Sequence, residues 1–383
     1  MSISPTAIIS TAPTIRISKA FWTLWKKGPL RKEPGLLPLQ SPFSRKEENG
    51  WRRKREQRKN ERRLLVRKVL VTGGAGFIGS HVVDGYLRRG WEVVVVDNLS
   101  TGKKDNLNRK ATFYKMDITD PDIDRLFLQE KFDLVNHHAA QIDVRISVRD
   151  PLLDAQINVL GTLNLLTNCQ KHKVDSFIFI SSGGVVYGEP NSLPPKEEFT
   201  KNPLSPYGVS KHTIEHYLYY YQQTFGLRYL ALRYANVYGP RQDPHGEAGV
   251  IAIFSGKMLQ GKTPFIYGDG EQLRDYIYVE DVVAANMAGT ERVQELNERQ
   301  ISSPDDLAYN VGTQKASSVN LIYQTLAQIT GFGKPARYAP KREGEIRRTY
   351  LNIEKAKKEL GWKPELDLRE GLVKTVDWFR ENS

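Results

Sequence analysis

A tyrosine and a lysine four residues apart are a residue pair whose side chains could together act in acid–base catalysis. Tyr207 and Lys211 would lie on one face of a helix, because residues four apart are neighbours on a helical surface. A phenol, whose reference pKa is about 10, becomes a useful base near neutral pH only when nearby cations favour the phenolate. The pair therefore predicts a general base with its supporting cation. The alternative is a tyrosine and a lysine on a solvated helix.

The place of this pair in the chain favours catalysis over that alternative. It follows a β-branched and aromatic run at residues 177–180, and that run ends in Ser181 and Ser182. An open parallel sheet presents its site at the carboxyl ends of its strands. A strand at 177–180 would therefore bring the two serines close to a helix that begins near Tyr207.

A glycine-rich turn after the first apolar run predicts a dinucleotide site. Gly73, Gly76 and Gly79 recur at every third position directly after the run at 69–71. The first glycine permits a tight turn, the second lets the backbone approach a pyrophosphate, and the third allows close packing of a helix on a strand. A purely structural glycine-rich turn is the alternative, and the expected order of strand, turn and helix disfavours it.

Two aspartates at the ends of later runs extend this prediction. Asp97 lies 18 residues after Gly79, where a carboxylate can accept hydrogen bonds from ribose hydroxyls and repel a 2′-phosphate. This position favours NAD over NADP, and an aspartate that caps a turn before Asn98 is the alternative. Asp117 follows a third run at 113–116 and is a candidate contact to the edge of the adenine.

The elements that must position these residues have the pattern of an α/β protein. From Lys68 onward, short β-branched runs alternate with amphipathic stretches, which predicts a doubly wound parallel sheet, the Rossmann type, with helices on both faces. The alternation breaks down after about Pro240, which predicts a smaller C-terminal domain. The runs that we expect to form strands lie at 69–71, 93–96, 134–135, 177–180 and 229–232.

We therefore expect three parts in the chain. Residues 1–66 would be a basic, disordered extension, and residues 67–240 an NAD-binding Rossmann domain. Residues 241–383 would mainly bind the substrate, with some segments that return to the first domain.

The formal charge of +12 is concentrated in the first 66 residues. They hold sixteen Lys and Arg against five Asp and Glu, a net +11, so +12 minus +11 leaves the remaining chain at +1. A nearly neutral body disfavours nucleic-acid binding by the globular part. The extension itself has three interpretations: a solvated tail or an over-extended gene start, an organelle transit peptide, or a nucleic-acid arm. We expect a cytoplasmic location, with a plastid or another organelle as the alternative if residues 1–66 are a transit peptide.

Other features of the sequence exclude further classes of protein. The apolar run at 20–25 stops at Lys26, far short of the roughly 18 to 20 residues that a membrane span requires. A single cysteine, Cys169, excludes a disulfide framework and is expected to be a packed, inert thiol. His137 and His138 are adjacent, so on a strand they would point to opposite faces and could not easily bind one metal ion.

Together these motifs resemble those of the extended short-chain dehydrogenases/reductases, over a stretch from about Lys68 to Ser383. The motifs that carry the resemblance are the glycine turn, Asp97, Ser181-Ser182 before Val186-Tyr187-Gly188, and the Tyr207/Lys211 pair. Segments 232–240, 274–276 and 342–345 resemble those of nucleotide-diphosphate-sugar epimerases within that family.

The resemblance implies NAD as the cofactor, no metal, a UDP-sugar substrate, a homodimer and no membrane partner. It implies that the catalytic residues are Tyr207, Lys211 and Ser182. It implies substrate contacts from Ser182, Asn236, Arg274, Arg342 and Glu345. The implied cofactor site consists of Gly73, Gly76, Phe77, Ile78, Gly79, Asp97, Asn98, Asp117, Ile118, Ala139, Ala140, Tyr207 and Lys211.

The turn after Ser182 separates the reactions of this family. Sugar dehydratases resemble Thr-Asp-Glu there and decarboxylating enzymes retain a Glu, because elimination after oxidation needs an additional acid or base. This chain has Gly183-Gly184-Val185. We therefore expect 4-epimerisation of UDP-glucose/UDP-galactose: Tyr207 takes the 4-hydroxyl proton, the C4 hydride passes to NAD, and the 4-keto sugar receives it back on its other face. The usual catalytic hydroxyl of the family would fall at Gly183, one place from Ser182, and Ser181 is the substitute candidate.

Three alternatives stay open at this point. The first is 4-epimerisation of another UDP-sugar, N-acetylated or uronic, because Thr349 aligns where strict UDP-glucose epimerases have a bulky tyrosine, although Tyr350 is adjacent. The second is a net nucleotide-sugar oxidoreductase or dehydratase. The third, of another class, is an NAD-responsive protein that binds nucleic acid through its basic extension.

Overall fold

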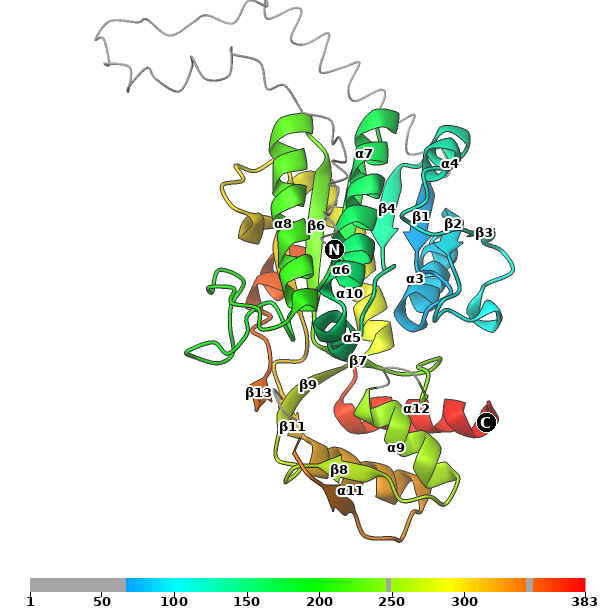
Figure 1. Ribbon diagram of the computed structural model, residues 1–383, viewed down its shortest axis with the longest axis vertical. Coiled ribbons are helices and arrows are strands. Elements are labelled where there is room, and N and C mark those ends of the chain that lie inside the picture. The colour runs from blue at the N-terminus through cyan, green and yellow to red at the C-terminus, as the bar shows by residue number, and fades with distance from the viewer. Residues whose placement is uncertain (1–66, 246–248, 342–346, 383) are drawn as a thin grey trace, which may run out of the picture. The chain divides into compact units, whose positions relative to one another are not determined.

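The fold is that of a computed structural model, which describes residues 67–245, 249–341 and 347–382. The described chain contains a seven-stranded, wholly parallel sheet with the strand order β10-β6-β5-β4-β1-β2-β3 (Figure 1). The strands are β1 (Lys68–Thr72), β2 (Glu92–Asp97), β3 (Thr112–Lys115), β4 (Leu134–His137), β5 (Ser176–Ser182), β6 (Arg228–Tyr234) and β10 (Ala308–Val311). The predicted doubly wound parallel sheet is therefore confirmed.

Helices cover both faces of this sheet. In Figure 1, α7 and α8 lie in front of the sheet, and α10 lies behind it, where it packs against α3, β5 and β6. The helices of this region are α3 (Phe77–Arg88), α4 (Ile123–Glu130), α5 (Val144–Arg149), α6 (Pro151–Ala155), the π-helix η2 (Gln156–Gly161), α7 (Thr162–His172), α8 (Pro206–Phe225) and α10 (Val279–Leu296), with the short 3₁₀ turns η1 (Lys104–Asn106) and η3 (Pro304–Leu307). We call residues 68–234 and 279–311 the large-sheet region.

The sequence explains where the longest helix begins and ends. Ser205 precedes α8 and its hydroxyl accepts a hydrogen bond from the backbone N–H of Gly208, while Pro206 occupies the first turn. Gly226 ends the helix in a left-handed conformation with φ of 72°. These signals fix the start of α8 one residue before Tyr207.

A second, smaller region contains shorter strands. Strand β9 (Leu273–Tyr278) pairs with β7 (Asn236–Tyr238), β11 (Ala316–Ser318) and β13 (Arg348–Thr349), and β8 (Phe265–Tyr267) pairs with β12 (Arg337–Ala339). Helices α9 (Val250–Leu259), α11 (Val319–Thr330) and α12 (Leu368–Glu381) pack on one another, and the π-helix η4 (Ala356–Leu360) lies against α10 and β10. We call residues 236–278 and 316–382 the small-sheet region.

The buried apolar residues of the described chain form three clusters. The largest consists of the buried residues of the large sheet and its helices together with Ile277, Ile353, Ala356, Leu360 and Trp362 of the small-sheet region, and Cys169 of α7 lies fully buried within it. Burial raises the pKa of the Cys169 thiol, so it stays protonated, as expected of a packed cysteine. The second cluster joins α9, α11 and α12 to β9. The smallest joins Val186 and Tyr187 to Leu351. In the described segments, no helix has the length and apolar character that crossing a membrane requires.

Candidate active site

The glycine-rich turn joins β1 to α3 with very little space around it. Gly73 has φ of 68°, a left-handed conformation, and a Cβ there would lie 2.6 Å from the backbone nitrogen of Ala139. A Cβ on Gly79 would lie 2.2 Å from the Gly73 carbonyl oxygen, whereas one on Gly76 would meet only that same oxygen, at 3.1 Å. Gly76 is therefore the open position of the turn, and α3 begins at Phe77 without any side-chain cap. An open helix N-terminus of this kind suits a pyrophosphate.

The Asp97 carboxylate at the end of β2 lies against this turn. One oxygen accepts a hydrogen bond from the backbone N–H of Ala75 at 3.0 Å, and the other accepts one from Leu99 at 2.8 Å. Burial raises the pKa of Asp97, although these two hydrogen bonds oppose the shift. The carboxylate thus stands beside the turn, where the ribose of a dinucleotide would lie, and it also holds the turn in place.

The end of β3 is tied to the end of β2 by side chains. The Asn98 amide donates to Asp117 at 2.7 Å, and Asp117 also accepts the backbone N–H of Thr119 at 2.8 Å. Burial works to raise the pKa of Asp117, but these hydrogen bonds outweigh it and lower the pKa. The next residue, Ile118, is buried and packs against Gly161, where a Cβ would lie 2.7 Å from the isoleucine side chain.

The Tyr207/Lys211 pair lies in the first two turns of α8. Lys211 is 4% exposed, its Nζ donates a 2.8 Å hydrogen bond to the carbonyl oxygen of Ile180, and this Nζ lies 5.7 Å from the centre of the Tyr207 ring. Burial lowers the pKa of Lys211 to about 8, while the charges of Asp154 and Glu215 oppose that shift. The ammonium is therefore fixed beneath a half-buried phenol, at the carboxyl end of β5.

The two serines at the end of β5 differ in accessibility. Ser181 is 2% exposed, and its Oγ is buried without a hydrogen-bond partner among the described residues. Ser182 is only half-buried, and its Oγ lies 3.8 Å from the position of a Cβ added to Gly184. Of the two candidates, Ser182 is the one whose hydroxyl a substrate can reach.

Gly183 is packed closely against the small-sheet region. A Cβ there would lie 2.5 Å from the end of the Leu351 side chain, and the backbone N–H of Gly183 donates to the carbonyl oxygen of Tyr234 at 2.9 Å. A side chain at position 183 would therefore require Leu351 to move.

His137 at the end of β4 and His138 directly after it are neutral, and His137 is fully buried. His137 lies between Thr72, 2.7 Å from its Nδ1, and Thr162, 2.9 Å from its Nε2, and burial lowers its pKa well below the usual value. Burial, together with the positive charge of Lys211, lowers the pKa of His138 to about 3. Ala139 and Ala140 follow directly, half-buried, with the Ala139 backbone against Gly73. Across the described ranges, no group of three or more His, Cys, Asp or Glu is arranged to hold a metal ion.

The predicted substrate residues lie around one strand of the small-sheet region. Arg274 is half-buried on β9, donates from Nη1 to the Leu273 carbonyl at 2.9 Å, and is in register with Thr349 of β13. Asn236 is exposed on β7, and this strand also pairs with β9, with Asn236 opposite Tyr276. Arg342 and Glu345 lie outside the described residues, as does the predicted extension over 1–66.

Comparison with known proteins identifies the family. Residues 69–312 match the model of the NAD dependent epimerase/dehydratase family. The chain is 48% identical to a putative UDP-glucose 4-epimerase of Methanocaldococcus jannaschii, over 82% of this chain and 99% of that protein. The chain belongs to the NAD dependent epimerase/dehydratase family.

Solved structures agree with this assignment. The UDP-glucose 4-epimerase of Thermotoga maritima, solved with UDP-glucose, is 47% identical and has a TM-score of 0.78 over 82% of this chain and 99% of its own. The UDP-glucose 4-epimerase of Thermus thermophilus, solved with NAD, is 42% identical and has a TM-score of 0.75 over 82% of this chain and all of its own. The chain is therefore an NAD-dependent enzyme of the extended short-chain dehydrogenase/reductase type, and its glycine turn and Asp97 fit a dinucleotide.

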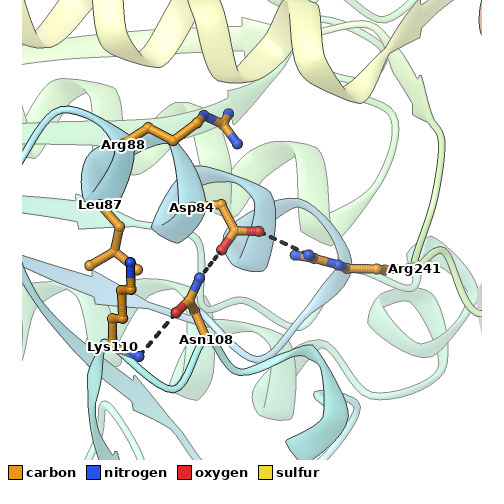
Figure 2. Close-up of a pocket in the computed structure, with 6 residues that line it drawn as sticks. All are labelled: Asp84, Leu87, Arg88, Asn108, Lys110 and Arg241. Atoms are coloured by element: carbon orange, nitrogen blue, oxygen red, sulfur yellow. Dashed lines mark hydrogen bonds and ion pairs between the residues drawn. The ribbon is translucent and has the colours of Figure 1, made fainter.

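A hollow elsewhere on the molecule is distinct from this epimerase-family site. It has a volume of about 310 Å³ and is lined by Asp84, Leu87, Arg88, Asn108, Lys110 and Arg241, none of which was predicted to act in binding or catalysis (Figure 2). Asp84 of α3 links residues on two sides of this hollow. Its carboxylate pairs with Arg241 at 2.8 Å and accepts a hydrogen bond from Asn108 at 2.7 Å. Just before Arg241, the Pro240 carbonyl lies 3.0 Å from Nε2 of His81, also on α3. These contacts attach the start of the small-sheet region to α3.

Two buried groups near the site were not singled out from the sequence. Asp275 of β9 is 1% exposed and accepts backbone hydrogen bonds from Thr313 and Leu351, so it holds Leu351 in place against Gly183. Arg233 of β6 pairs with Glu215 of α8, one helical turn beyond Lys211. An Asp after an Arg in segment 274–276 was visible in the sequence, but its partners were not.

Proposed function

We propose that this protein catalyses the NAD-dependent 4-epimerisation of a nucleotide-diphosphate sugar, with UDP-glucose and UDP-galactose as its substrate pair. The observation that carries the proposal is the arrangement at the end of β5. The Lys211 ammonium lies under Tyr207 and hydrogen-bonds to Ile180 of β5, the half-buried Ser182 ends the same strand, and the following turn, Gly183-Gly184-Val185, contains no carboxylate. A base with its cation and a hydroxyl suffices for oxidation and reduction at one carbon, whereas elimination would need a further acid.

The proposed roles of the chain's residues follow from their positions. Tyr207, as phenolate, accepts the proton of the sugar 4-hydroxyl and later returns a proton to the same oxygen. Ser182 holds that oxygen in place, and Lys211 stabilises the phenolate. NAD, when bound, supplies the hydride acceptor and donor for C4. The glycine turn, Asp97 and the ends of β3 and β4 would hold it.

The small-sheet region would hold the part of the substrate that does not react. Arg274 offers a guanidinium to the diphosphate, and Asn236 an amide, from strands that meet at β9. We accordingly assign NAD binding to residues 67–240 and substrate binding mainly to residues 241–383. Anchoring the nucleotide would let the oxidised sugar rotate and present its other face without leaving the site.

The experiment is incubation of the purified protein with UDP-galactose without added cofactor, with UDP-glucose measured by chromatography. We expect UDP-glucose to form, because the cofactor is retained and no net redox change occurs. If no UDP-glucose forms while denatured protein releases NAD, the cofactor site stands and the sugar assignment is wrong.

A second substrate class is favoured by one position. Thr349 is half-buried beside Arg274 and is much smaller than a tyrosine, so the space that it leaves suits a sugar with an acetamido group at C2. We propose that UDP-N-acetylated sugars are additional substrates. Turnover of UDP-N-acetylgalactosamine at less than about one hundredth of the rate with UDP-galactose would contradict this.

We also propose a homodimer, through the outer surface of α5, α6, η2 and α8. These helices contact one another and expose a group of large apolar side chains. The group comprises Val148, Leu152, Leu153, Leu160, Val209, Tyr217 and Tyr220, with Leu152 82% exposed. A contiguous apolar surface of this kind is typical of an interface between copies. Sedimentation analysis of the wild type and of Leu152→Asp tests it: we expect a dimer and a shift toward monomer, and a monomeric wild type would refute the proposal.

The location in the cell is a separate proposal. We infer that the enzyme acts in the cytoplasm, whereas residues 1–66, if they are a transit peptide, would direct it to an organelle. Fluorescent fusions of the full chain and of residues 67–383 separate the two, because only a transit peptide makes their locations differ.

A further inference from the structure

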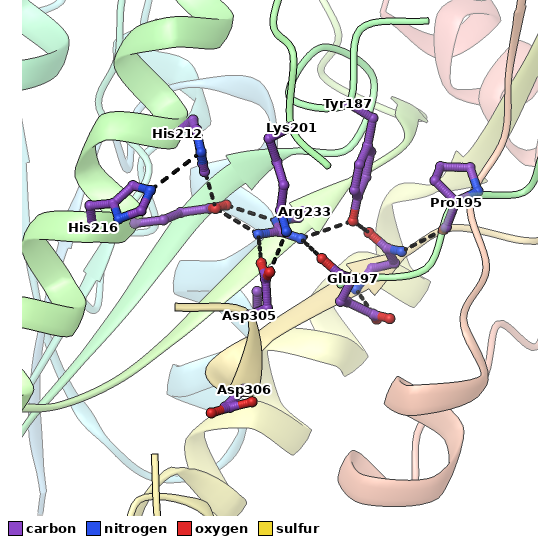
Figure 3. A network of polar contacts seen from close by, with 12 residues as sticks. Tyr187, Pro195, Glu197, Lys201, His212, His216, Arg233, Asp305 and Asp306 are labelled. Atoms are coloured by element: carbon purple, nitrogen blue, oxygen red, sulfur yellow. Dashed lines mark hydrogen bonds and ion pairs between the residues drawn. The ribbon is translucent and has the colours of Figure 1, made fainter. Parts of the chain in front are cut away.

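One fully buried arginine beside the active site uses every hydrogen-bond donor that it has. Nε and Nη2 of Arg233 donate to the two carboxylate oxygens of Glu215, at 2.9 and 2.7 Å. Nη2 also donates to Asp305 at 2.7 Å, and Nη1 donates to the hydroxyl of Tyr187 and to the carbonyl oxygen of Glu197, both at 2.9 Å (Figure 3). An arginine has five N–H donors, and all five are accounted for. We call Arg233, Glu215, Asp305, Tyr187 and Glu197 the Arg233 cluster.

The members of this cluster come from the segments that carry the reacting groups. Glu215 is four residues after Lys211, which is four after Tyr207, so the three side chains form one stripe along α8. Tyr187 and Glu197 belong to the segment that directly follows Ser182, and Arg233 itself is in register with Ser181 on the neighbouring strand. One guanidinium on β6 therefore connects α8, the segment that follows Ser182, and η3.

The cluster is closed by further contacts at both ends. The Tyr187 hydroxyl donates to Asn310 of β10 at 2.8 Å, and Asn310 makes three other contacts, to Glu197, Pro195 and Asn352. At the other end, Lys201 pairs with Asp305. The cations Arg233 and Lys201 balance the carboxylates of Glu215 and Asp305, so these ions are neutralised locally.

We propose that Arg233 and Glu215 are the positioning residues of the active site, which hold Tyr207, Lys211 and the Ser182 segment in their reactive arrangement. A fork of two parallel hydrogen bonds fixes direction as well as distance, which a single point charge does not. Misplacement of a reacting group by about 1 Å can cost about a hundredfold in rate. The kinetic part of this proposal rests on the proposed epimerase function, while the positional part does not.

The same arrangement bears on the charge of Lys211. The titratable and charged groups that interact with it are His137 at the end of β4, His138 directly after β4, Asp154 from α6, and Tyr207 and Glu215 on α8. Both histidines are neutral, so Asp154 and Glu215 are the anions that offset the burial of the ammonium. Arg233 keeps Glu215 ionised: burial works to raise the pKa of Glu215, but the arginine fork lowers it well below its usual range.

The first test is hydrogen–deuterium exchange of the NAD-bound protein, which needs no sugar. Glu215→Gln keeps the shape and one oxygen acceptor for Arg233 but removes the charge. We expect faster exchange at residues 183–188 and 205–211 and unchanged exchange at β1 and β2. Wild-type exchange in both segments would overturn the proposal. If Glu215→Gln does not fold, Tyr187→Phe removes one acceptor of Arg233 and leaves the ion pair, and the expectation for residues 183–188 is the same.

A matched control separates positioning from loss of stability. Asp281 is another buried carboxylate, 3% exposed, which accepts backbone hydrogen bonds from Glu365 and Leu366 away from α8. Asp281→Asn is expected to lower the unfolding temperature without changing exchange at 183–188 or 205–211. If Asp281→Asn accelerates exchange in those segments as much as Glu215→Gln does, the faster exchange reflects a general loss of stability, and the proposal fails.

The second test is kinetic and uses UDP-galactose, with kcat expressed per bound NAD. For Glu215→Gln we expect kcat to fall about tenfold to a hundredfold with KM nearly unchanged. We also expect the alkaline limb of the kcat profile to move about one unit to lower pH, because removal of an anion lowers the pKa of Lys211. An alkaline limb at its wild-type position would refute the role of Glu215. Absence of turnover by the wild type would instead refute the substrate, and the exchange experiment would still decide the positional proposal.

Discussion

The large-sheet region and the small-sheet region hold their functional residues in different ways. Every residue of β4 is buried, and β5 and β6 are buried over nearly their whole length between helices on both faces. By contrast, β8, β11 and β13 are two or three residues long and have exposed or half-buried positions. Buried packing on both sides restrains side chains strongly, so the reacting groups lie where restraint is greatest. In the small-sheet region β9 is mostly buried, whereas these shorter strands restrain their side chains less.

The largest expected effect lies in the large-sheet region. Tyr207→Phe removes the proton acceptor but keeps the ring, so bound NAD is expected to stay while kcat falls by about a thousandfold or more. NAD content of the purified variant and its turnover of UDP-galactose measure the two quantities. Activity within tenfold of the wild type would show that Tyr207 is not the proton acceptor. The view that the reacting groups lie in the large-sheet region would then be wrong.

A change at half-buried Arg274 of the small-sheet region should act on binding instead. Arg274→Ala removes a charged contact to the diphosphate, so KM is expected to rise about tenfold to a hundredfold with a smaller change in kcat. Arg274→Lys is the matched control, which keeps the charge and loses the fork. A fall in kcat as large as that of Tyr207→Phe, with KM unchanged, would show that both regions take part in the chemistry.

Asp97 tests the cofactor side of the large-sheet region. Asp97→Ala removes the group that favours a ribose hydroxyl over a 2′-phosphate, so preference for NAD over NADP is expected to fall about tenfold. Its hydrogen bond to Ala75 is lost as well, so NAD should also be retained less tightly. Dissociation constants of both cofactors for the stripped protein provide the measurement, and an unchanged ratio would exclude Asp97 from the site.

Thr349 should show the adaptability of the small-sheet region. Thr349→Tyr fills space beside Arg274, so turnover of UDP-N-acetylgalactosamine relative to UDP-galactose is expected to fall several-fold, by about 1 kcal/mol of discrimination. Thr349→Ser is the control, because it leaves the space open. Equal losses for both sugars would mean that the side chain does not lie near C2 of the sugar.

The smallest expected effect is a dependence on pH. Burial lowers the pKa of Lys211 from its usual value to about 8, so the ammonium is present below that pH and is lost as the pH rises through it. The kcat of the wild type should therefore be about half-maximal near pH 8 and decline above it. A kcat profile that stays flat well above pH 8 would contradict this.

The sequence predicted those parts of the fold that local patterns determine. The runs at 93–96 and 177–180 were expected to be strands and are buried within β2 and β5. Strand β10 was not expected, because its sequence Ala-Tyr-Asn-Val contains an asparagine, which suits a buried strand only when its amide is satisfied. Asn310 is satisfied by Tyr187, Pro195 and Asn352, all distant in sequence.

The same limit applies to the candidate site. The glycine turn and the Tyr207/Lys211 spacing are local, so they could be predicted. The pairing of Arg233 with Glu215 joins a strand to a helix, and the contact of Leu351 with Gly183 joins two regions, so neither follows from periodicity. For Asp97 the sequence left two interpretations open, a ribose contact and a cap of the turn before Asn98, and its carboxylate does accept the backbone N–H of Leu99. Its second hydrogen bond, from Ala75 of the glycine turn, is visible only in the folded chain.

The two glycines after Ser182 differ in what a change of sequence would allow. A side chain at position 183 fits only if the end of the Leu351 side chain moves, because an added Cβ would lie 2.5 Å from it. Position 184 is open, with Ser182 Oγ as the nearest atom at 3.8 Å from an added Cβ. A substitution at position 184 would therefore bring a new side chain beside Ser182 without repacking, whereas a substitution at position 183 would need the buried residues around Leu351 to adjust.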